Sequence, residues 1–237
     1  MKSLALALTC ALALPAAAQG PCATDAMIVF DGSASMAEIG FDTGETNRIT
    51  DARAAMARVM PEVEHSRRIG LITYGPGAKD ACEGISLRFP PIEAAAKLMI
   101  AELDALEPAG LTPLVAAVQR AADVLDYRLN PGIIVLVTDG NETCGGRPCA
   151  LGRALTATAA DLTVHVIGYK ASHDFFGWNN PEGGAPGTDV VARCLADTTG
   201  GRYIGTHSEY ELVEALWSML GCEFVAGSQP VGHPSKM

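Results

Sequence analysis

The chain has 237 residues and a formal net charge of −10 at pH 7, and 49% of its residues are hydrophobic. This length is enough for one α/β domain with a sizeable core. The acidic balance argues against nucleic acid as a partner, because contacts to phosphate need Lys and Arg, whereas it is compatible with cation binding and with basic partners.

Residues 1–18 have the pattern of a secretory signal peptide. Lys2 precedes an apolar run over residues 4–14, and Ala16, Ala17 and Ala18 form a small-residue cleavage site. The run is too short to span a membrane, and no later stretch is long and apolar enough. We therefore expect a periplasmic or secreted protein with no membrane span, one domain over residues 22–222 and a flexible tail over residues 223–237.

The first strand expected after this leader ends in a group of oxygen-bearing side chains. The apolar residues 27–30 are followed by Asp31, Ser33 and Ser35 at alternate positions. Such a polar group belongs to the loop at the carboxyl end of the strand, where open α/β sheets place their ligand sites. Hard oxygen donors suit a hard divalent cation such as Mg²⁺. A serine-rich turn that caps the next helix is the alternative.

The next part of the chain alternates helices and strands. Periodicity predicts a helix over residues 49–63, a buried strand over 68–74, a short strand over 85–89 and a helix over 92–106. We expect Pro90 and Pro91 to stop the short strand, which would pair at the edge of the sheet.

Two later segments add further oxygen donors. Thr112 precedes Pro113, which suits the first position of a helix, and the pattern predicts that helix over residues 114–125. Residues 132–138 are the most continuous apolar run after the leader and predict a central parallel strand buried on both faces. Asp139 lies where this strand ends.

The remainder continues the alternation, with a helix over residues 148–159, a strand over 162–169, a helix over 190–197, a strand over 202–205 and a helix over 208–220. Strands that alternate with helices predict a mostly parallel sheet with helices on both faces. The aromatic residues Phe175, Phe176 and Trp178 lie in a loop that follows a strand. They are candidate partner-binding anchors, or else an apolar staple folded onto the domain.

Together, these segments resemble the metal-ion-dependent adhesion site of the von Willebrand factor type A family, whose pattern is Asp-x-Ser-x-Ser, then a Thr, then an Asp after a later strand. The resemblance spans residues 26–220. It implies an α/β fold with a three-layer, doubly wound, Rossmann-like sheet, mostly parallel, in the order 3-2-1-4-5-6 with one antiparallel edge strand. The matching positions are Asp31, Ser33, Ser35, Thr112 and Asp139.

The resemblance also implies how these residues act. Ser33 and Ser35 would contact the cation directly, Thr112 would do so in the ligand-competent state, and the two acids would act mainly through water. The cofactor would be Mg²⁺, with Mn²⁺ or Ca²⁺ as alternatives, and an open position on it would accept an Asp or Glu carboxylate from a protein partner. The implied function is divalent-cation-dependent protein binding, without catalysis.

Two other functions are compatible with parts of this pattern. One is a Mg²⁺-dependent phosphohydrolase with Asp31 as nucleophile, but enzymes of the haloacid-dehalogenase type carry a second Asp two residues on, where this chain has Ser33. The other is an exported scaffold whose metal site is purely structural.

Without Cys10, which lies in the leader, an even number of cysteines remains, as expected for disulfides in an exported chain. Six cysteines allow 15 connectivities. We favour Cys22–Cys222, because the ends of a domain often lie close together. For the others we favour Cys82–Cys144 and Cys149–Cys194, with a tight Cys144–Cys149 bridge as the alternative. A zinc site is disfavoured, because no second close pair of cysteines is present.

Overall fold

The computed structural model describes residues 24–39, 46–77, 81–169 and 192–222. The strands are β1 (Ala26–Asp31), β2 (Ile69–Tyr74), β3 (Ser86–Ile92), β4 (Pro131–Thr138), β5 (Asp161–Tyr169) and β6 (Tyr203–Thr206). The helices are the 3-10 helix η2 (Ala34–Ala37), α1 (Arg48–Val63), α2 (Ala96–Asp104), α3 (Leu114–Val124), α4 (Pro148–Thr158), α5 (Arg193–Thr198) and α6 (Glu209–Leu220).

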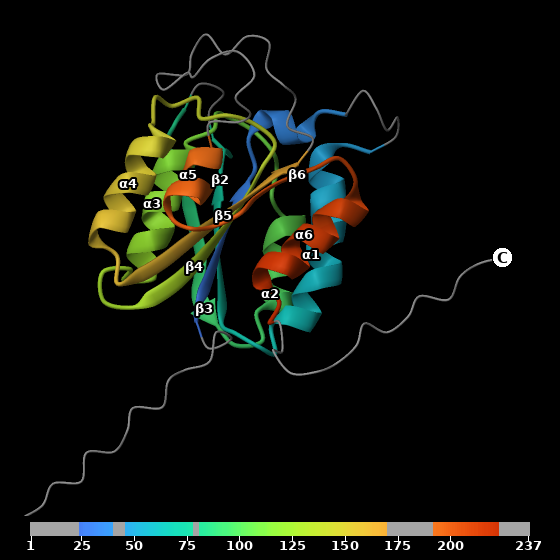
Figure 1. Cartoon of the computed structure of the whole chain (residues 1–237). Helices are drawn as coiled ribbons and strands as arrows, with labels where there is room; N and C mark the ends of the chain where they lie inside the picture. Colours follow the sequence, from blue (N-terminus) through green and yellow to red (C-terminus); the bar gives the residue numbers. More distant parts are fainter. Residues whose placement is uncertain (1–23, 40–45, 78–80, 170–191, 223–237) are drawn as a thin grey trace, which may run out of the picture.

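The strands form one six-stranded sheet in the order β3-β2-β1-β4-β5-β6. All neighbouring strands are parallel except β2 and β3, which pair antiparallel at the edge. Helices α1, α2 and α6 cover one face of the sheet and α3, α4 and α5 cover the other (Figure 1). The α/β class, the strand order and the antiparallel edge strand predicted from the sequence are therefore confirmed.

The sequence of the central strand β1 is apolar up to its last residue, without the alternation of polar and apolar residues that a strand with one exposed face has. Ile28 and Phe30 pack into the core beneath α1 and α6, and Met27 and Val29 pack into the core beneath α3. Successive side chains of a strand point to opposite faces, and both faces are covered here, so every position has to be apolar. The first residue that breaks the run, Asp31, lies at the carboxyl end of the strand.

Two predicted boundaries are wrong, and both lie where the chain passes from β3 to α2. Strand β3 continues through Pro90 and Pro91 to Ile92, because an edge strand tolerates residues that lack an N–H. Helix α2 begins at Ala96 rather than at residue 92. Ala94 has a φ of 51°, which interrupts helical geometry, and the carboxylate of Glu64 accepts a hydrogen bond of 2.7 Å from the N–H of Ala96.

Two disulfides lie within the described ranges. Cys82 pairs with Cys144 and Cys149 pairs with Cys194, which are the pairings favoured from the sequence and exclude the tight Cys144–Cys149 bridge. Cys222 is also disulfide-bonded. Its expected partner Cys22 lies outside the described residues, so that pairing stays a prediction.

Several other sequence-based predictions also fall outside the described part of the chain. They concern the signal peptide at 1–18, the tail at 223–237 and the aromatic residues Phe175, Phe176 and Trp178. Within the described part, no helix has both the length and the apolar character needed to cross a membrane.

His165, which lies in β5, makes the stability of the fold depend on pH. The backbone N–H of Arg202 donates a hydrogen bond of 3.0 Å to Nδ1 of His165, so the ring is neutral there. Burial, followed by the positive charges of Arg202 and Arg67, lowers the pKa of His165 from 6.5 to about 4. The unfolded chain therefore takes up this proton first as the pH falls, and stability is lost between about pH 6.5 and about pH 4.

We expect this histidine to account for a loss of about 1–2 kcal/mol in the free energy of unfolding, given that the ring is partly exposed. Urea unfolding of the wild type and of His165→Gln, which keeps an acceptor but does not titrate, would be compared at about pH 7 and about pH 4.5. The variant should lose less stability between the two values. An equal loss in both proteins would contradict the assignment.

Candidate metal centre

Two acids at the carboxyl ends of neighbouring strands define the centre. Asp31 is the last residue of β1, and Asp139 directly follows β4. The two strands are parallel and in register, with Phe30 opposite Val137. Asp31 has an exposed fraction of 0% and Asp139 of 3%, so two buried acids lie at the same end of the sheet, at the carboxyl ends of parallel strands.

The two serines connect these acids in one chain of hydrogen bonds. The backbone N–H of Ser33 donates to Oδ1 of Asp31 at 2.8 Å, and the hydroxyl oxygens of Ser33 and Ser35 lie 3.1 Å apart. The hydroxyl of Ser35 donates to Oδ1 of Asp139 at 2.8 Å. Because the proton of Ser35 is directed at Asp139, its lone pairs are left for other partners. Four of the five predicted ligands are thus brought together.

Two hydroxyl groups that the sequence analysis did not assign to the site bond to the carboxylate of Asp31. Tyr74 and Thr138 both lie within hydrogen-bonding distance of its Oδ2, at 2.8 and 2.7 Å. Burial raises the pKa of Tyr74 well above its ordinary value, so the phenol keeps its proton and acts as a donor. The orientation of the Asp31 carboxylate is therefore determined before any ligand binds.

Asp139 is paired with an arginine that the sequence analysis also missed. Nη1 of Arg48 lies 2.8 Å from Oδ2 of Asp139, whose side chain is fully buried. Burial, followed by the negative charge of Asp31, raises the pKa of Asp139 to about 6, while Ser35 and Arg48 act in the opposite direction. Burial and the neighbouring acid therefore outweigh the pairing with Arg48 in setting the pKa of Asp139.

Thr112, the fifth predicted ligand, lies beside the other four without bonding to them. The N–H of Ala34 donates to the carbonyl of Gly110 at 3.2 Å, which joins the two loops. The N–H of Thr112 donates to the hydroxyl of Thr143 at 2.8 Å, and the N–H of Thr143 donates back to the carbonyl of Thr112 at 3.1 Å. Within the described chain the Thr112 hydroxyl makes no hydrogen bond, so it is available to a ligand.

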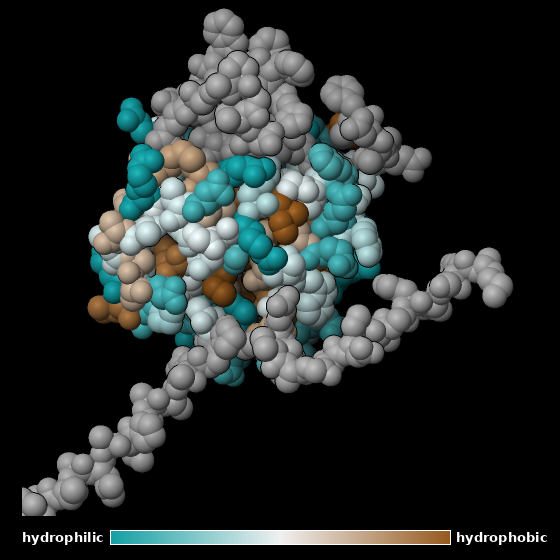
Figure 2. Space-filling view, viewed as in Figure 1, coloured by the Kyte–Doolittle hydropathy of each residue, from teal (hydrophilic) through white to brown (hydrophobic). Residues whose placement is uncertain are grey.

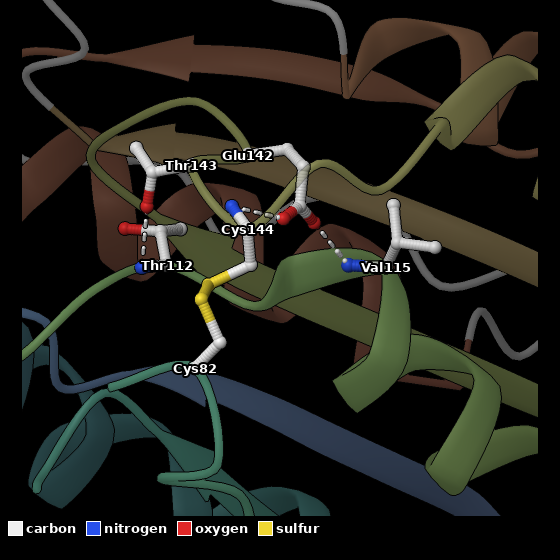
Figure 3. The surroundings of a disulfide bond; sticks show 6 residues. All are labelled: Cys82, Thr112, Val115, Glu142, Thr143 and Cys144. Atoms are coloured by element: carbon white, nitrogen blue, oxygen red, sulfur yellow. Dashed lines mark hydrogen bonds between the residues drawn. A yellow bond between two sulfur atoms is a disulfide. The ribbon is translucent and has the colours of Figure 1, made fainter. Parts of the chain in front are cut away.

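Glu142 organises the same region from the loop that follows β4. Its carboxylate accepts hydrogen bonds from the N–H groups of Val115 and Cys144, at 2.8 and 2.7 Å (Figure 3). It thereby caps the start of α3, whose own N-cap position is Pro113, a residue with no side-chain cap. The disulfide from Cys144 to Cys82 ties this loop to the segment between β2 and β3 (Figure 3). The backbone of Thr112 is therefore held from several sides.

Residues 26–142 match the family model of the von Willebrand factor type A domain. This part of the chain belongs to the von Willebrand factor type A family. The Bacillus subtilis (strain 168) protein YwmD is 27% identical over 219 residues, which cover 88% of this chain and 90% of YwmD. Because this match covers 88% of the chain, it extends beyond the segment covered by the family model.

Solved structures support the fold of this type A domain. An aerotolerance-related membrane protein from Bacteroides fragilis aligns with a TM-score of 0.59 at 20% identity, over 83% of this chain and 98% of that one. Proximal thread matrix protein 1 from the mussel byssus, in a structure with a zinc-occupied MIDAS motif, aligns with a TM-score of 0.55 at 15% identity, over 84% of this chain and 46% of that one. At these identities the likeness shows the fold alone.

The residues of this type A domain fit a hard divalent cation. Among the described residues, no three or more His, Cys, Asp or Glu side chains are grouped so that they could hold a metal ion, so a cation here depends on hydroxyl oxygens beside the two acids. Oδ1 of Asn141, two residues after Asp139, is buried and has no hydrogen-bond donor. A buried oxygen that has no donor within the described chain takes its partner from an ordered water or a cation, which is compatible with a hydrated cation at this end of the sheet.

Proposed function

We propose that this chain is a divalent-cation-dependent protein-binding module. The observation that carries the proposal is the convergence of Asp31, Ser33, Ser35 and Asp139 in one chain of hydrogen bonds at the ends of adjacent strands. Family membership supports an interaction module, and the zinc-occupied site of the mussel relative supports a cation at this position. Mg²⁺ is the proposed cation, because the donors are hard oxygens.

Each residue has a proposed part in this binding. Ser33 and Ser35 hold the cation directly, while Asp31 and Asp139 orient the serines and bind through water. When bound, the cation supplies an electrophilic position for an Asp or Glu carboxylate of the partner. Thr112, whose hydroxyl has no hydrogen-bond partner among the described residues, completes the ligand set. Because few anionic oxygens contact the cation, its attraction for an outside carboxylate stays strong.

The surface is consistent with recognition by polar groups rather than by a large apolar patch. Figure 2 shows that, on the face it presents, hydrophobic residues of the described chain are scattered singly among hydrophilic ones. Isolated apolar residues are normal on the surface of a protein and do not mark an interface. This face of the described chain therefore offers no large apolar patch, and the proposed recognition depends on the carboxylate of the partner.

Catalysis with Asp31 as nucleophile is not part of the proposal. Its Oδ1 accepts from the Ser33 N–H, its Oδ2 lies against the hydroxyls of Tyr74 and Thr138, and the residue has no exposed surface. A nucleophile needs a free oxygen directed at its substrate. Turnover of a generic phosphate ester would restore the enzymatic alternative.

We also propose that the protein acts outside the cytoplasm, in the periplasm or after secretion. Both described disulfides, and the disulfide at Cys222, agree with an oxidising compartment. The leader over residues 1–18 agrees with export.

The test is to remove the two hydroxyls that are proposed to contact the cation. Ser33→Ala/Ser35→Ala is expected to weaken Mg²⁺ and Mn²⁺ binding, measured by isothermal titration calorimetry, by about 100-fold or more, since loss of a single outer partner already costs about 10–100-fold. In a pull-down from a periplasmic extract, proteins retained in Mg²⁺ should be released by chelator and should not bind to the variant.

Ser218→Ala is the matched control, because its hydroxyl bonds to a carbonyl of its own helix, that of Ala215. It should bind cation and partner like the wild type. Partner binding that persists in chelator and in the double variant would falsify the proposed function. If removing the cation unfolds the chain instead, a purely structural metal site is the better description.

A further inference from the structure

Arg48 lies at a position where a positive charge is unfavourable for its own helix. It is the first residue of α1, next to the N-cap Asn47. The N-terminal end of a helix carries partial positive charge, so acidic side chains are favoured there and basic ones are favoured at the opposite end. Asp51 in the first turn follows this rule, whereas Arg48 breaks it. A reason for the arginine must therefore come from outside the helix.

That reason is the metal centre, because every acceptor of the Arg48 guanidinium among the described residues belongs to it or borders it. Nη1 lies 2.8 Å from Oδ2 of Asp139, 3.2 Å from the carbonyl oxygen of Ser35 and 3.4 Å from the carboxylate of Glu38. Glu38 is largely exposed, with a side-chain exposed fraction of 67%, whereas those of Arg48 and Asp139 are 11% and 0%. The buried pair with Asp139 is therefore the principal contact.

The pair is poorly suited to a purely structural role. Nε of Arg48 is buried and has no acceptor in the described part of the chain, so the guanidinium is only partly satisfied there. Buried ion pairs give little net stability even when every donor is paired, because both charges lose their hydration. An arginine that is costly to its helix and incompletely bonded, yet is directed at Asp139, serves the charge balance of the site.

We propose, on the basis of the cation site in the proposed function, that Arg48 is an internal counter-cation that sets the affinity of the site. It neutralises Asp139 when no cation is bound, and it opposes a divalent cation held by Ser33 and Ser35, because Ser35 and Arg48 bond to the two oxygens of the same carboxylate. The domain therefore binds divalent cations weakly and exchanges them readily. A positioning residue of this kind acts through its charge rather than its shape.

The test compares Arg48→Gln, which removes the charge, with Arg48→Lys, which keeps it. Mg²⁺ and Mn²⁺ affinities of the full chain would be measured by isothermal titration calorimetry, and melting temperatures would be measured in chelator. Arg48→Gln should bind Mg²⁺ at least about tenfold more tightly than the wild type and melt at a lower temperature without cation. Arg48→Lys should stay close to the wild type in affinity.

Arg58→Gln is the control, because Arg58 lies on the same helix but pairs with Glu209 at the surface. It should leave cation affinity unchanged. Unchanged or weaker Mg²⁺ binding by Arg48→Gln, or equal affinities of the Gln and Lys variants, would overturn the inference and leave the proposed function standing. If neither the wild type nor Arg48→Gln binds any divalent cation, both are wrong. Binding that appears only in Arg48→Gln would support the inference strongly.

Discussion

Gly75→Ala is expected to abolish detectable cation binding and to lower the free energy of unfolding by about 3 kcal/mol or more. Gly75 follows β2 with a φ of +107°, a conformation that residues with a side chain rarely adopt. A Cβ at this position would overlap the backbone nitrogen of Ser33 and the carbonyl carbon of Gly32. Both belong to the loop of the metal centre, and backbone atoms cannot move aside as a flexible side chain can.

The substitution therefore acts on the site through the loop. The N–H of Ser33 donates to Asp31, and the N–H of Gly32 donates to the carbonyl of Tyr74. A displacement that relieves the overlap breaks at least one of these bonds and moves the two serine hydroxyls apart from the acids. Urea denaturation measures the loss of stability, and calorimetric titration with Mg²⁺ measures the loss of binding.

Two other glycines separate the cost of the positive φ from the cost of the steric overlap. Gly145 has a φ of +79° but open space around its missing Cβ, so Gly145→Ala should show only the backbone cost of about 1 kcal/mol. Gly140, next to Asp139, has neither a positive φ nor a close neighbour, so Gly140→Ala should behave like the wild type. A Gly75→Ala protein that binds Mg²⁺ as well as the Gly140→Ala protein would show that the contact with the Ser33 loop is unimportant.

The sequence was sufficient for the position of the two acids because each ends an apolar run. Residues 27–30 and 132–138 are uninterrupted and apolar, which is the pattern of strands covered on both faces. Once two such strands are neighbours and parallel, their carboxyl ends meet, and residues more than a hundred positions apart come together. The structure has this pairing between β1 and β4.

The groups that orient these acids could not be predicted in the same way, because they depend on side-chain packing between distant segments. Tyr74 read as the last apolar residue of a strand, yet its hydroxyl lies against Asp31, 43 positions away. Arg48 precedes the helix predicted over residues 49–63 and Glu142 follows Asp139, and the sequence pattern assigns a role to neither. Periodicity shows which face of an element is buried, but not which polar group at its end meets which partner.

The short-range errors had a different cause. The sequence pattern of β3 contains two prolines, which predict a stop after Phe89 even though the strand is expected at the edge of the sheet. Because β3 is an edge strand, Pro90 and Pro91 are tolerated, and the start of α2 moves four residues along the chain to Ala96. The edge location was part of the prediction, so the error lies in treating the two prolines as a stop where an edge strand tolerates them.

Removal of the Cys82–Cys144 disulfide is expected to lower the free energy of unfolding by about 4 kcal/mol and to weaken Mg²⁺ binding about tenfold. The stability term follows from the sequence separation of 62 residues, since the bond restricts a long loop in the unfolded chain. The affinity term follows from geometry, because Cys144 adjoins Thr143, which holds the backbone of Thr112 beside the centre (Figure 3). The variant is Cys82→Ala/Cys144→Ala, measured by urea denaturation and by calorimetric titration.

The second disulfide provides a control, because its expected contribution to the free energy of unfolding is nearly the same. Cys149 and Cys194 are separated by 45 residues, for which the chain-entropy model also gives about 4 kcal/mol, but they join α4 to α5 rather than the loops of the centre. Cys149→Ala/Cys194→Ala should therefore lose similar stability while binding Mg²⁺ like the wild type. If both double variants lose affinity equally, weaker binding reflects general destabilisation, and Thr112 is not positioned by the first disulfide. A loss confined to Cys82→Ala/Cys144→Ala would mean that this covalent bond contributes directly to the arrangement of the cation ligands.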